Sequence, residues 1–298
     1  MAISIQTKRM PIVRRRHTRI PLTSIVIYVI CILIAFSAMF PFFWTVSSSL
    51  KKPSEIVTFP PTWIPAVPQW HNYARVFEMV TFLTWVLNSL YVTTLTTLGV
   101  VVSATLVAFS FARFEYRGRD LLFLITLGTM MMPAQVTLIP QYLLFNKLKW
   151  LNTFKPLWIP AWFGGGGFFI FLLRQFIMSL PKDLDEAAII DGANYPRILW
   201  SILVPLCKPA LSTVAVVCFI SSWNDYMGPL IYLNERAKFT MALGLDALKW
   251  QEGTESSGEP TFQFMMAACV MAIIPCVALF FVAQRYFVQG IVMSGIKG

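Results

Sequence analysis

The segment 183–209, DLDEAAIIDGANYPRILWSILVPLCKP, is a polar stretch between two strongly apolar runs, and the rest of the chain is organised around it. Asp183 and Asp185 have side chains that cap helix N-termini, and the alanines and isoleucines after them favour a short helix. Gly192 is expected to end this helix, and Tyr195 and Pro196 are expected to begin another. The segment therefore predicts two short helices joined at a glycine.

Small side chains suit the first of these helices to close contact with another protein. Ala187, Ala188 and Ala193 would let its backbone approach a partner, and a glycine would free the turn. Glu186 and Asp191 would then be the polar groups at the contact. The sequence DEAA is also ordinary for a first helical turn, so the residues taken singly leave both interpretations open.

The spacing within this segment resembles the EAA loop of ABC importer permeases, whose pattern is E-A-A-x3-G-x9-I-x-L-P. The corresponding residues here are Glu186-Ala187-Ala188, Gly192, Ile202, Val204 and Pro205. Valine stands at 204 where leucine is usual, which removes one methylene and keeps the contact apolar. The resemblance implies that the loop is a coupling helix, seated in a groove of a separate ATP-hydrolysing subunit on the cytoplasmic side.

The composition is that of a membrane protein that crosses the bilayer several times. Of the 298 residues, 57% are hydrophobic and 13% are charged, and the mean hydropathy is +0.65. Soluble domains carry about 25% charged residues. The net charge of +10 does not indicate a nucleic-acid partner, because no base-reading module is present and 15 of the 24 Lys and Arg fall on one predicted side of the bilayer. This asymmetry predicts that both termini are cytoplasmic.

An all-α fold with six membrane spans is predicted, since each span takes about 20 apolar residues. The first run continues through bulky Phe40 and Trp44, so an uncleaved helix is favoured over a signal peptide. A basic cytoplasmic tail at 1–21 precedes a permease domain at 22–298, with the cytoplasmic loop at 181–209. The predicted spans are 22–46, 82–112, 121–145, 157–178, 210–233 and 262–282.

Polar residues in the third and fifth spans are candidates for a transport pathway. Gln135 and Gln141 stand beside prolines 133 and 140, and a broken helix is tolerated where it packs inside a bundle or lines a wet cavity. Asn224 and Asp225 are predicted in the outer half of the fifth span. A carboxylate there either has a function or lies so close to the lipid headgroups that its charge costs little free energy.

The fourth span contains four consecutive glycines, Gly164 to Gly167. Each costs a helix about 0.8–1 kcal/mol relative to alanine, so something must offset them. Two features could offset this cost. One is close approach of another helix, and the other is an unwound pathway segment around Gly165. The run is not a phosphate-binding loop, because no Lys followed by Ser or Thr comes after it. The chain is therefore predicted to have no ATP site and to bind no cofactor itself.

No metal site or catalytic group is predicted. His17 and His71 fall in separate loops, and the five cysteines form no CxxC pair. An intramembrane enzyme would need a nucleophile with its base or a metal triad, and the spans contain no histidine.

The resemblance extends over nearly the whole chain to the second, shorter permease of maltose-type carbohydrate importers. It implies the architecture of a type I ABC importer permease in a bacterial inner membrane. It also implies a second homologous permease, two ATP-binding subunits that use the ATP, and an extracytoplasmic sugar-binding protein facing the acidic loop 234–261. The alternative is an ion-coupled secondary transporter that would use Asp225. The sequence leaves the identity of the sugar open.

Overall fold

The computed structural model describes residues 22–56, 58–251 and 262–294, and all regular structure in these ranges is helical. The all-α prediction is therefore confirmed. The chain divides into two compact units, residues 1–44 and 45–298. The predicted tail at 1–21, residues 252–261 of the acidic loop and the last four residues lie outside the described ranges.

Most of helix α1 (Leu22–Ser49) belongs to the smaller unit. This helix has 28 residues, none of them charged. Its apolar side chains are exposed around the helix, as in Phe36 at 75%. A helix that is hydrophobic all round requires lipid or a second protein around it, which fits a membrane span.

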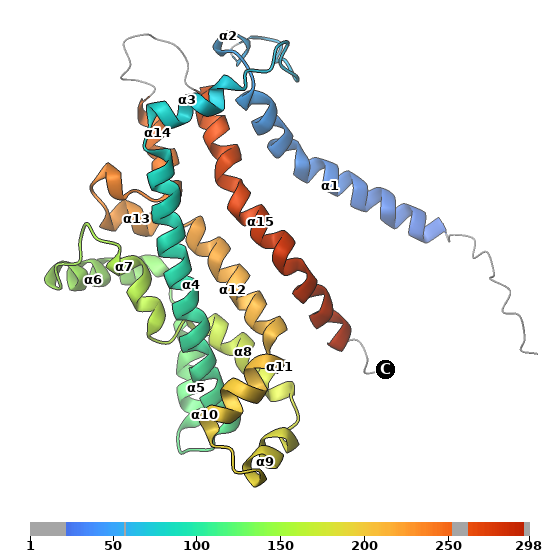
Figure 1. Ribbon diagram of the computed structural model, residues 1–298, viewed down its shortest axis with the longest axis vertical. Coiled ribbons are helices and arrows are strands. Elements are labelled where there is room, and N and C mark those ends of the chain that lie inside the picture. The colour runs from blue at the N-terminus through green and yellow to red at the C-terminus, as the bar shows by residue number, and fades with distance from the viewer. Residues whose placement is uncertain (1–21, 57, 252–261, 295–298) are drawn as a thin grey trace, which may run out of the picture. The chain divides into compact units, whose positions relative to one another are not determined.

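Helix α4 (Phe82–Arg113) is the central element of the larger unit. It packs against α8 (Gly167–Ser179) and α12 (Lys208–Trp223), and α12 packs in turn on α15 (Phe262–Ser294) (Figure 1). Small residues allow these contacts, since Ala104 and Ala108 are both fully buried. At Gly99 an added Cβ would lie 2.6 Å from the ring of Trp162, so that only glycine fits there.

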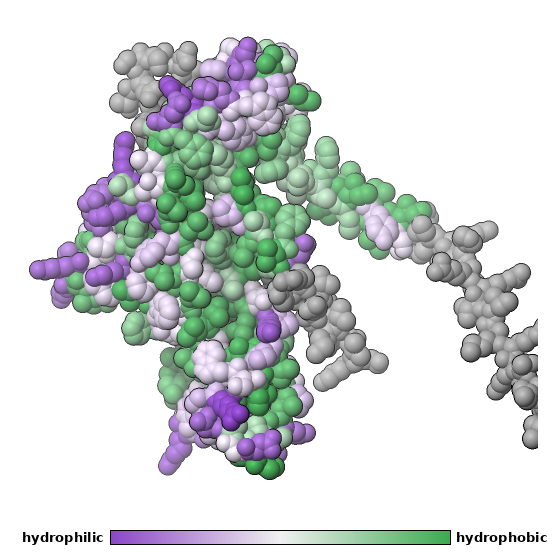
Figure 2. Space-filling view, viewed as in Figure 1, coloured by the Kyte–Doolittle hydropathy of each residue, from purple (hydrophilic) through white to green (hydrophobic). Residues whose placement is uncertain are grey.

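Short helices lie at both ends of α4 (Figure 1). Near its start are α3 (His71–Met79), α14 (Met241–Gln251) and, nearby in the chain, α2 (Pro53–Ile56). Near its end are α9 (Asp183–Ile190) and α10 (Tyr195–Arg197). In Figure 2 hydrophilic side chains gather over both ends of this unit and over the region of α6 and α13, with mainly apolar side chains between. This distribution is the one that a membrane-crossing unit requires.

Four described helices have the length and composition to cross a membrane, and two bent pairs pass the same criteria together. The six-span prediction is met only if each bent pair counts as one span. The four helices are Thr23–Ser49, Phe82–Arg113, Lys155–Ser179 and Phe262–Gln284, and the pairs are Arg119–Thr129 with Ala134–Lys147 and Tyr195–Leu206 with Lys208–Trp223.

The third predicted span, 121–145, is not one helix. Helices α5 (Arg119–Thr129) and α6 (Ala134–Lys147) meet at an angle of 96°. The cause is Pro133, which lacks an N–H and has an extended ψ of 132° directly before α6. Pro140, the other predicted break, lies within α6 without ending it.

The fourth predicted span, 157–178, is interrupted at its glycines. It consists of α7 (Lys155–Trp158), a short 3-10 helix (Ile159–Trp162) and α8. Between the last two, Gly164, Gly165 and Gly166 all have positive φ. Gly165 is buried, and a Cβ there would come within 2.9 Å of Ala104 Cβ and 3.0 Å of the Val100 carbonyl oxygen. The run is thus both unwound and pressed against α4, and the place of Gly165 in the pathway stays a prediction.

The fifth predicted span, 210–233, ends ten residues early, because α12 stops at Trp223. Asn224 and Asp225 lie in the break before α13 (Met227–Tyr232). The Asp225 Oδ1 accepts a hydrogen bond from the Gly228 N–H at 3.2 Å, so this carboxylate satisfies a free donor in the first turn of α13. A single-turn 3-10 helix (Arg236–Lys238) follows before α14.

Candidate functional site

Helix α9 contains Glu186, Ala187 and Ala188 of the motif and ends in the predicted glycine turn. The Gly192 N–H donates to the Ile189 carbonyl and the Ala193 N–H donates to the Ala188 carbonyl, each at 2.9 Å. With a φ of 82° at Gly192, this is the Schellman arrangement, in which glycine adopts the left-handed conformation without strain. The prediction of two helices joined at Gly192 is confirmed.

The predicted caps of α9 are wrong. Lys182 occupies the N-cap position with no side-chain cap hydrogen bond, and Asp183 and Asp185 fall in the first turn. Their charges there still complement the positive end of the helix dipole. The second helix has the cap that the first lacks, because Asn194 Oδ1 accepts from the Arg197 N–H at 3.0 Å.

The chain continues from α10 as a π-helix (Ile198–Leu203) and a single α-turn, α11 (Val204–Leu206). Ile198, Leu199 and Leu203 are buried in the core formed with α4 and α8. Pro205 of the motif is exposed. π-helical segments recur at functional sites, and this one joins the motif helix to the start of α12.

The small residues of α9 face in two directions. Ala188, predicted to contact a partner, is 7% exposed and belongs to the core of this chain, with Ala193 half-buried beside it. That part of the prediction is wrong, because Ala188 packs within this chain, where α9 contacts the π-helix that follows α10. Ala187 and Glu186 are exposed, as are Asp191 and Gly192, so these four stay candidates for a partner contact.

The exposed surface of α9 is largely apolar. Ile190 is 86% exposed, Ile189 50% and Leu184 39%. The sequence pattern predicts only that the isoleucines continue the helix. The available signal was that an eight-residue helix between polar turns cannot bury every apolar side chain of DLDEAAII, so that some must face a partner.

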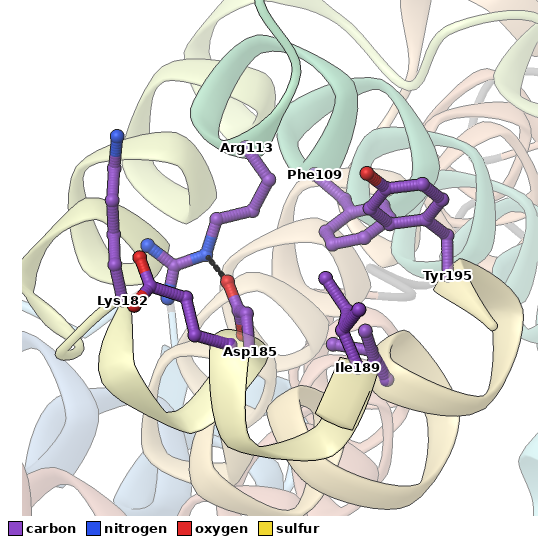
Figure 3. A pocket seen from close by; sticks show the side chains of 8 residues that line it. Phe109, Arg113, Lys182, Asp185, Ile189 and Tyr195 are labelled. Atoms are coloured by element: carbon purple, nitrogen blue, oxygen red, sulfur yellow. Dashed lines mark ion pairs between the residues drawn. The ribbon is translucent and has the colours of Figure 1, made fainter. Parts of the chain in front are cut away.

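A buried ion pair connects α9 to α4, as Figure 3 shows. Arg113, the last residue of α4, has its Nε 2.6 Å from Asp185 Oδ2, and the two side chains are 5% and 14% exposed. The Arg113 Nη2 also donates to the Leu180 carbonyl at the end of α8, at 3.3 Å. One guanidinium thus holds together the ends of α4 and α8 and the first turn of α9.

The surroundings of this pair make the interaction strong. Phe109, Ile189 and Ile198 line the same pocket and exclude water from one side (Figure 3). Burial raises the pKa of the Asp185 carboxyl, and the Arg113 guanidinium opposes this shift. Asp185 Oδ1 is buried and has no hydrogen-bond partner among the described residues. The carboxylate charge is therefore compensated mainly by Arg113, with a smaller contribution from Lys182.

The candidates for pathway lining do not form one site. Gln135 and Gln141 are exposed on α6, and no described hydrogen bond joins them to the residues after α12. Asn224 donates to the Ile220 carbonyl at 2.8 Å and lines a pocket between α12, α14 and α15, together with Trp223 and Cys269. These amide and carboxylate groups stay predictions.

Residues 101–293 match a family model described as "Binding-protein-dependent transport system inner membrane component". This range contains Arg113, the whole of α9 and the glycine turn. The chain belongs to this family. Members of this family are the membrane components of binding-protein-dependent importers.

Individual relatives match this chain over most of their length. The arabinooligosaccharides transport system permease protein AraQ of Halalkalibacterium halodurans is 31% identical over 268 residues, which are 89% of this chain and 93% of that protein. The trehalose/maltose transport system permease protein MalG of Thermococcus litoralis is 31% identical over 280 residues, 93% of this chain and 98% of that one.

A solved structure confirms the fold. One chain of a bacterial ABC transporter involved in the import of the acidic polysaccharide alginate superposes with a TM-score of 0.78 at 26% identity, covering 93% of this chain and all of that one. The permease therefore has the architecture of an ABC importer membrane subunit. It is a transporter subunit rather than an enzyme, and it works in a membrane with a binding protein.

Proposed function

We propose that this permease forms half of the translocation pathway of a carbohydrate importer and receives the movement of an ATPase subunit through α9. The observation that supports this most is the exposed face of α9. It presents Ile190, Glu186 and Ala187 at the end of the larger unit that also carries its polar loops. Exposed isoleucines beside a carboxylate suit insertion into a groove of another protein.

The proposed cargo is an oligosaccharide. Two relatives are named for arabinooligosaccharides and for trehalose and maltose, and the structural neighbour imports a polysaccharide. These carriers share the sugar class and differ in the sugar and its charge. In this chain, the groups proposed to line the pathway are the amides of Gln135, Gln141 and Asn224 and the carboxylate of Asp225. These groups can form hydrogen bonds with the hydroxyl groups of a sugar.

The complete assembly would contain a second homologous permease, two ATP-binding subunits and an extracytoplasmic sugar-binding protein. ATP would be used by the ATP-binding subunits alone. The membrane would be the bacterial inner membrane, with both termini and α9 in the cytoplasm, as the distribution of Lys and Arg favours. ATP-driven closure of the ATPase pair would move α9 and open the pathway outward.

Uptake into proteoliposomes tests this function. The complex is reconstituted with its binding protein outside and ATP inside, with no ion gradient, and labelled arabino-oligosaccharides and malto-oligosaccharides are offered. Uptake of at least one of them is expected to require both ATP and the binding protein. A non-hydrolysable ATP analogue is the control and should reduce uptake to background.

A different result would support the alternative function. Uptake that requires a proton or sodium gradient and is independent of ATP would identify a secondary transporter. Asp225 would then be the candidate ion-coupling residue.

A further inference from the structure

Short non-helical segments connect helix α9 to the rest of the chain on both sides. The glycine turn with positive φ at Gly192 follows it, and the extended residue Leu180, with ψ of 138°, precedes it by three residues. An eight-residue helix between such turns has no continuous helical backbone that joins it to α8 or α10. Side-chain contacts must supply the connection.

Helix α9 contacts the π-helix Ile198–Leu203, and two further features fix it to the core of this chain. Ala188 packs in the apolar core, and Asp185 pairs with Arg113. An alanine contact is small and non-directional, so it permits rotation and sliding. A buried ion pair at 2.6 Å is a strong electrostatic contact, since little water screens it, and the same guanidinium also binds the end of α8 through the Leu180 carbonyl.

We infer that the Arg113–Asp185 ion pair is the mechanical joint that makes α9 and α4 move as one body. This inference rests on the proposed coupling role of α9. Arg113 and Asp185 are positioning residues, which act on the pathway through the helices they connect. They are distinct from Glu186 and Ile190, which face outward to the partner.

Helix α4 is suited to carry the movement away from the joint. It has 32 residues, which correspond to about 48 Å of continuous helix. It contacts α8 and α12 along its length and α14 near its start. A displacement at Arg113 would therefore reach the end of the larger unit where α3 and α14 lie (Figure 1).

The chain contains a matched control for this joint. Lys182 and Glu115 join the same two regions, one residue before α9 and two residues after α4, with Nζ 3.9 Å from Oε1. Their side chains are 64% and 81% exposed. An exposed pair at this distance fixes little, because water and salt screen it and both side chains are free to rotate.

The structural test measures the distance between α9 and α4 in the complete complex. Spin labels are attached to Asp183→Cys on α9 and Leu106→Cys on α4, which are both exposed positions. The distance between the labels is measured by pulsed electron paramagnetic resonance with and without ATP and vanadate. In the otherwise unchanged complex, one narrow distance distribution is expected in both states. The double variant Arg113→Gln with Asp185→Asn should broaden it and make it depend on nucleotide. This double variant is used because it leaves no unpaired buried charge, so that the fold is preserved.

The functional readout is the number of ATP molecules hydrolysed per oligosaccharide imported. The double variant should raise this ratio at least fivefold while the ATPase subunit still co-purifies. Arg113→Lys, which keeps the charge, should recover part of the coupling. Glu115→Gln, which breaks the exposed pair and leaves Lys182 in place, should leave the ratio and the distances unchanged.

Other outcomes overturn the inference. A distance that already changes with nucleotide before any variant is introduced would show that α9 and α4 are not one body. A double variant with the original ratio, or one that loses the ATPase subunit altogether, would show that the pair is not the joint. If the unaltered permease fails to co-purify with an ATPase subunit, the proposed function fails instead, and the two failures are thereby distinguished.

Discussion

Substitution of Gly192 by proline is expected to abolish transport while the protein still inserts into the membrane. Proline fixes φ near −65°, whereas the residue at 192 has a φ of 82°. Proline also removes the N–H that donates to the Ile189 carbonyl at the end of α9. Helix α9 would then leave the turn in another direction, and its exposed face would no longer point to the partner. Uptake should fall at least a hundredfold, measured in membranes that contain equal amounts of each variant.

The control for this change is Gly192→Asn. Asparagine tolerates the left-handed conformation and keeps the N–H, and nothing lies within 4 Å of a Cβ at this position. It should retain most of the transport activity. Equal loss in the two variants would show that the turn geometry is not what matters at Gly192.

Reversal of charge at Glu186 is the second change with a large expected effect. Glu186 is exposed on α9. It lies on the face, with both polar and apolar side chains, that we propose enters the ATPase subunit. We expect Glu186 to pair with a cation of the ATPase subunit on docking, and loss of one partner of a buried charge pair typically costs about 3–5 kcal/mol. For Glu186→Lys we expect the amount of ATPase subunit that co-purifies with the permease to fall at least a hundredfold.

Glu115→Lys provides the comparison, because Glu115 is 81% exposed in its side chain and lies outside α9. Co-purification should be unchanged in this variant, so that a general effect of added positive charge is excluded. If Glu186→Lys binds the ATPase subunit as the original chain does, Glu186 has no role in docking.

Some features could be predicted from local sequence because local chemistry determines them. The turn at Gly192 follows from the ease with which glycine adopts positive φ, and the bounds of α4 follow from a long apolar run that ends in Arg113. The positions of breaks were visible as prolines and glycines. The bend angles at these breaks could not be predicted. A proline shows where a helix is interrupted, but tertiary packing decides how far it bends.

The roles of Asp185 and Ala188 could not be predicted for a different reason. An aspartate in a first helical turn has the same local signature whether it caps the helix or pairs with a distant cation, and Arg113 is far away in the sequence. A small residue suits contact with a partner and contact with its own core equally well. Both questions depend on which face of α9 points inward, and its sequence has no clear amphipathic pattern that would show this.

Disulfide or bifunctional crosslinking from α9 to a co-expressed ATPase subunit tests the coupling role most directly. The five native cysteines are replaced, and a single cysteine is placed at the exposed Ile190→Cys or at the buried Ala188→Cys. The account predicts that Ile190→Cys crosslinks efficiently, with a yield that changes on addition of ATP, and that Ala188→Cys gives at most a tenth of that yield. Absence of any crosslink from Ile190→Cys in a properly inserted complex, or a higher yield from Ala188→Cys, would contradict the account.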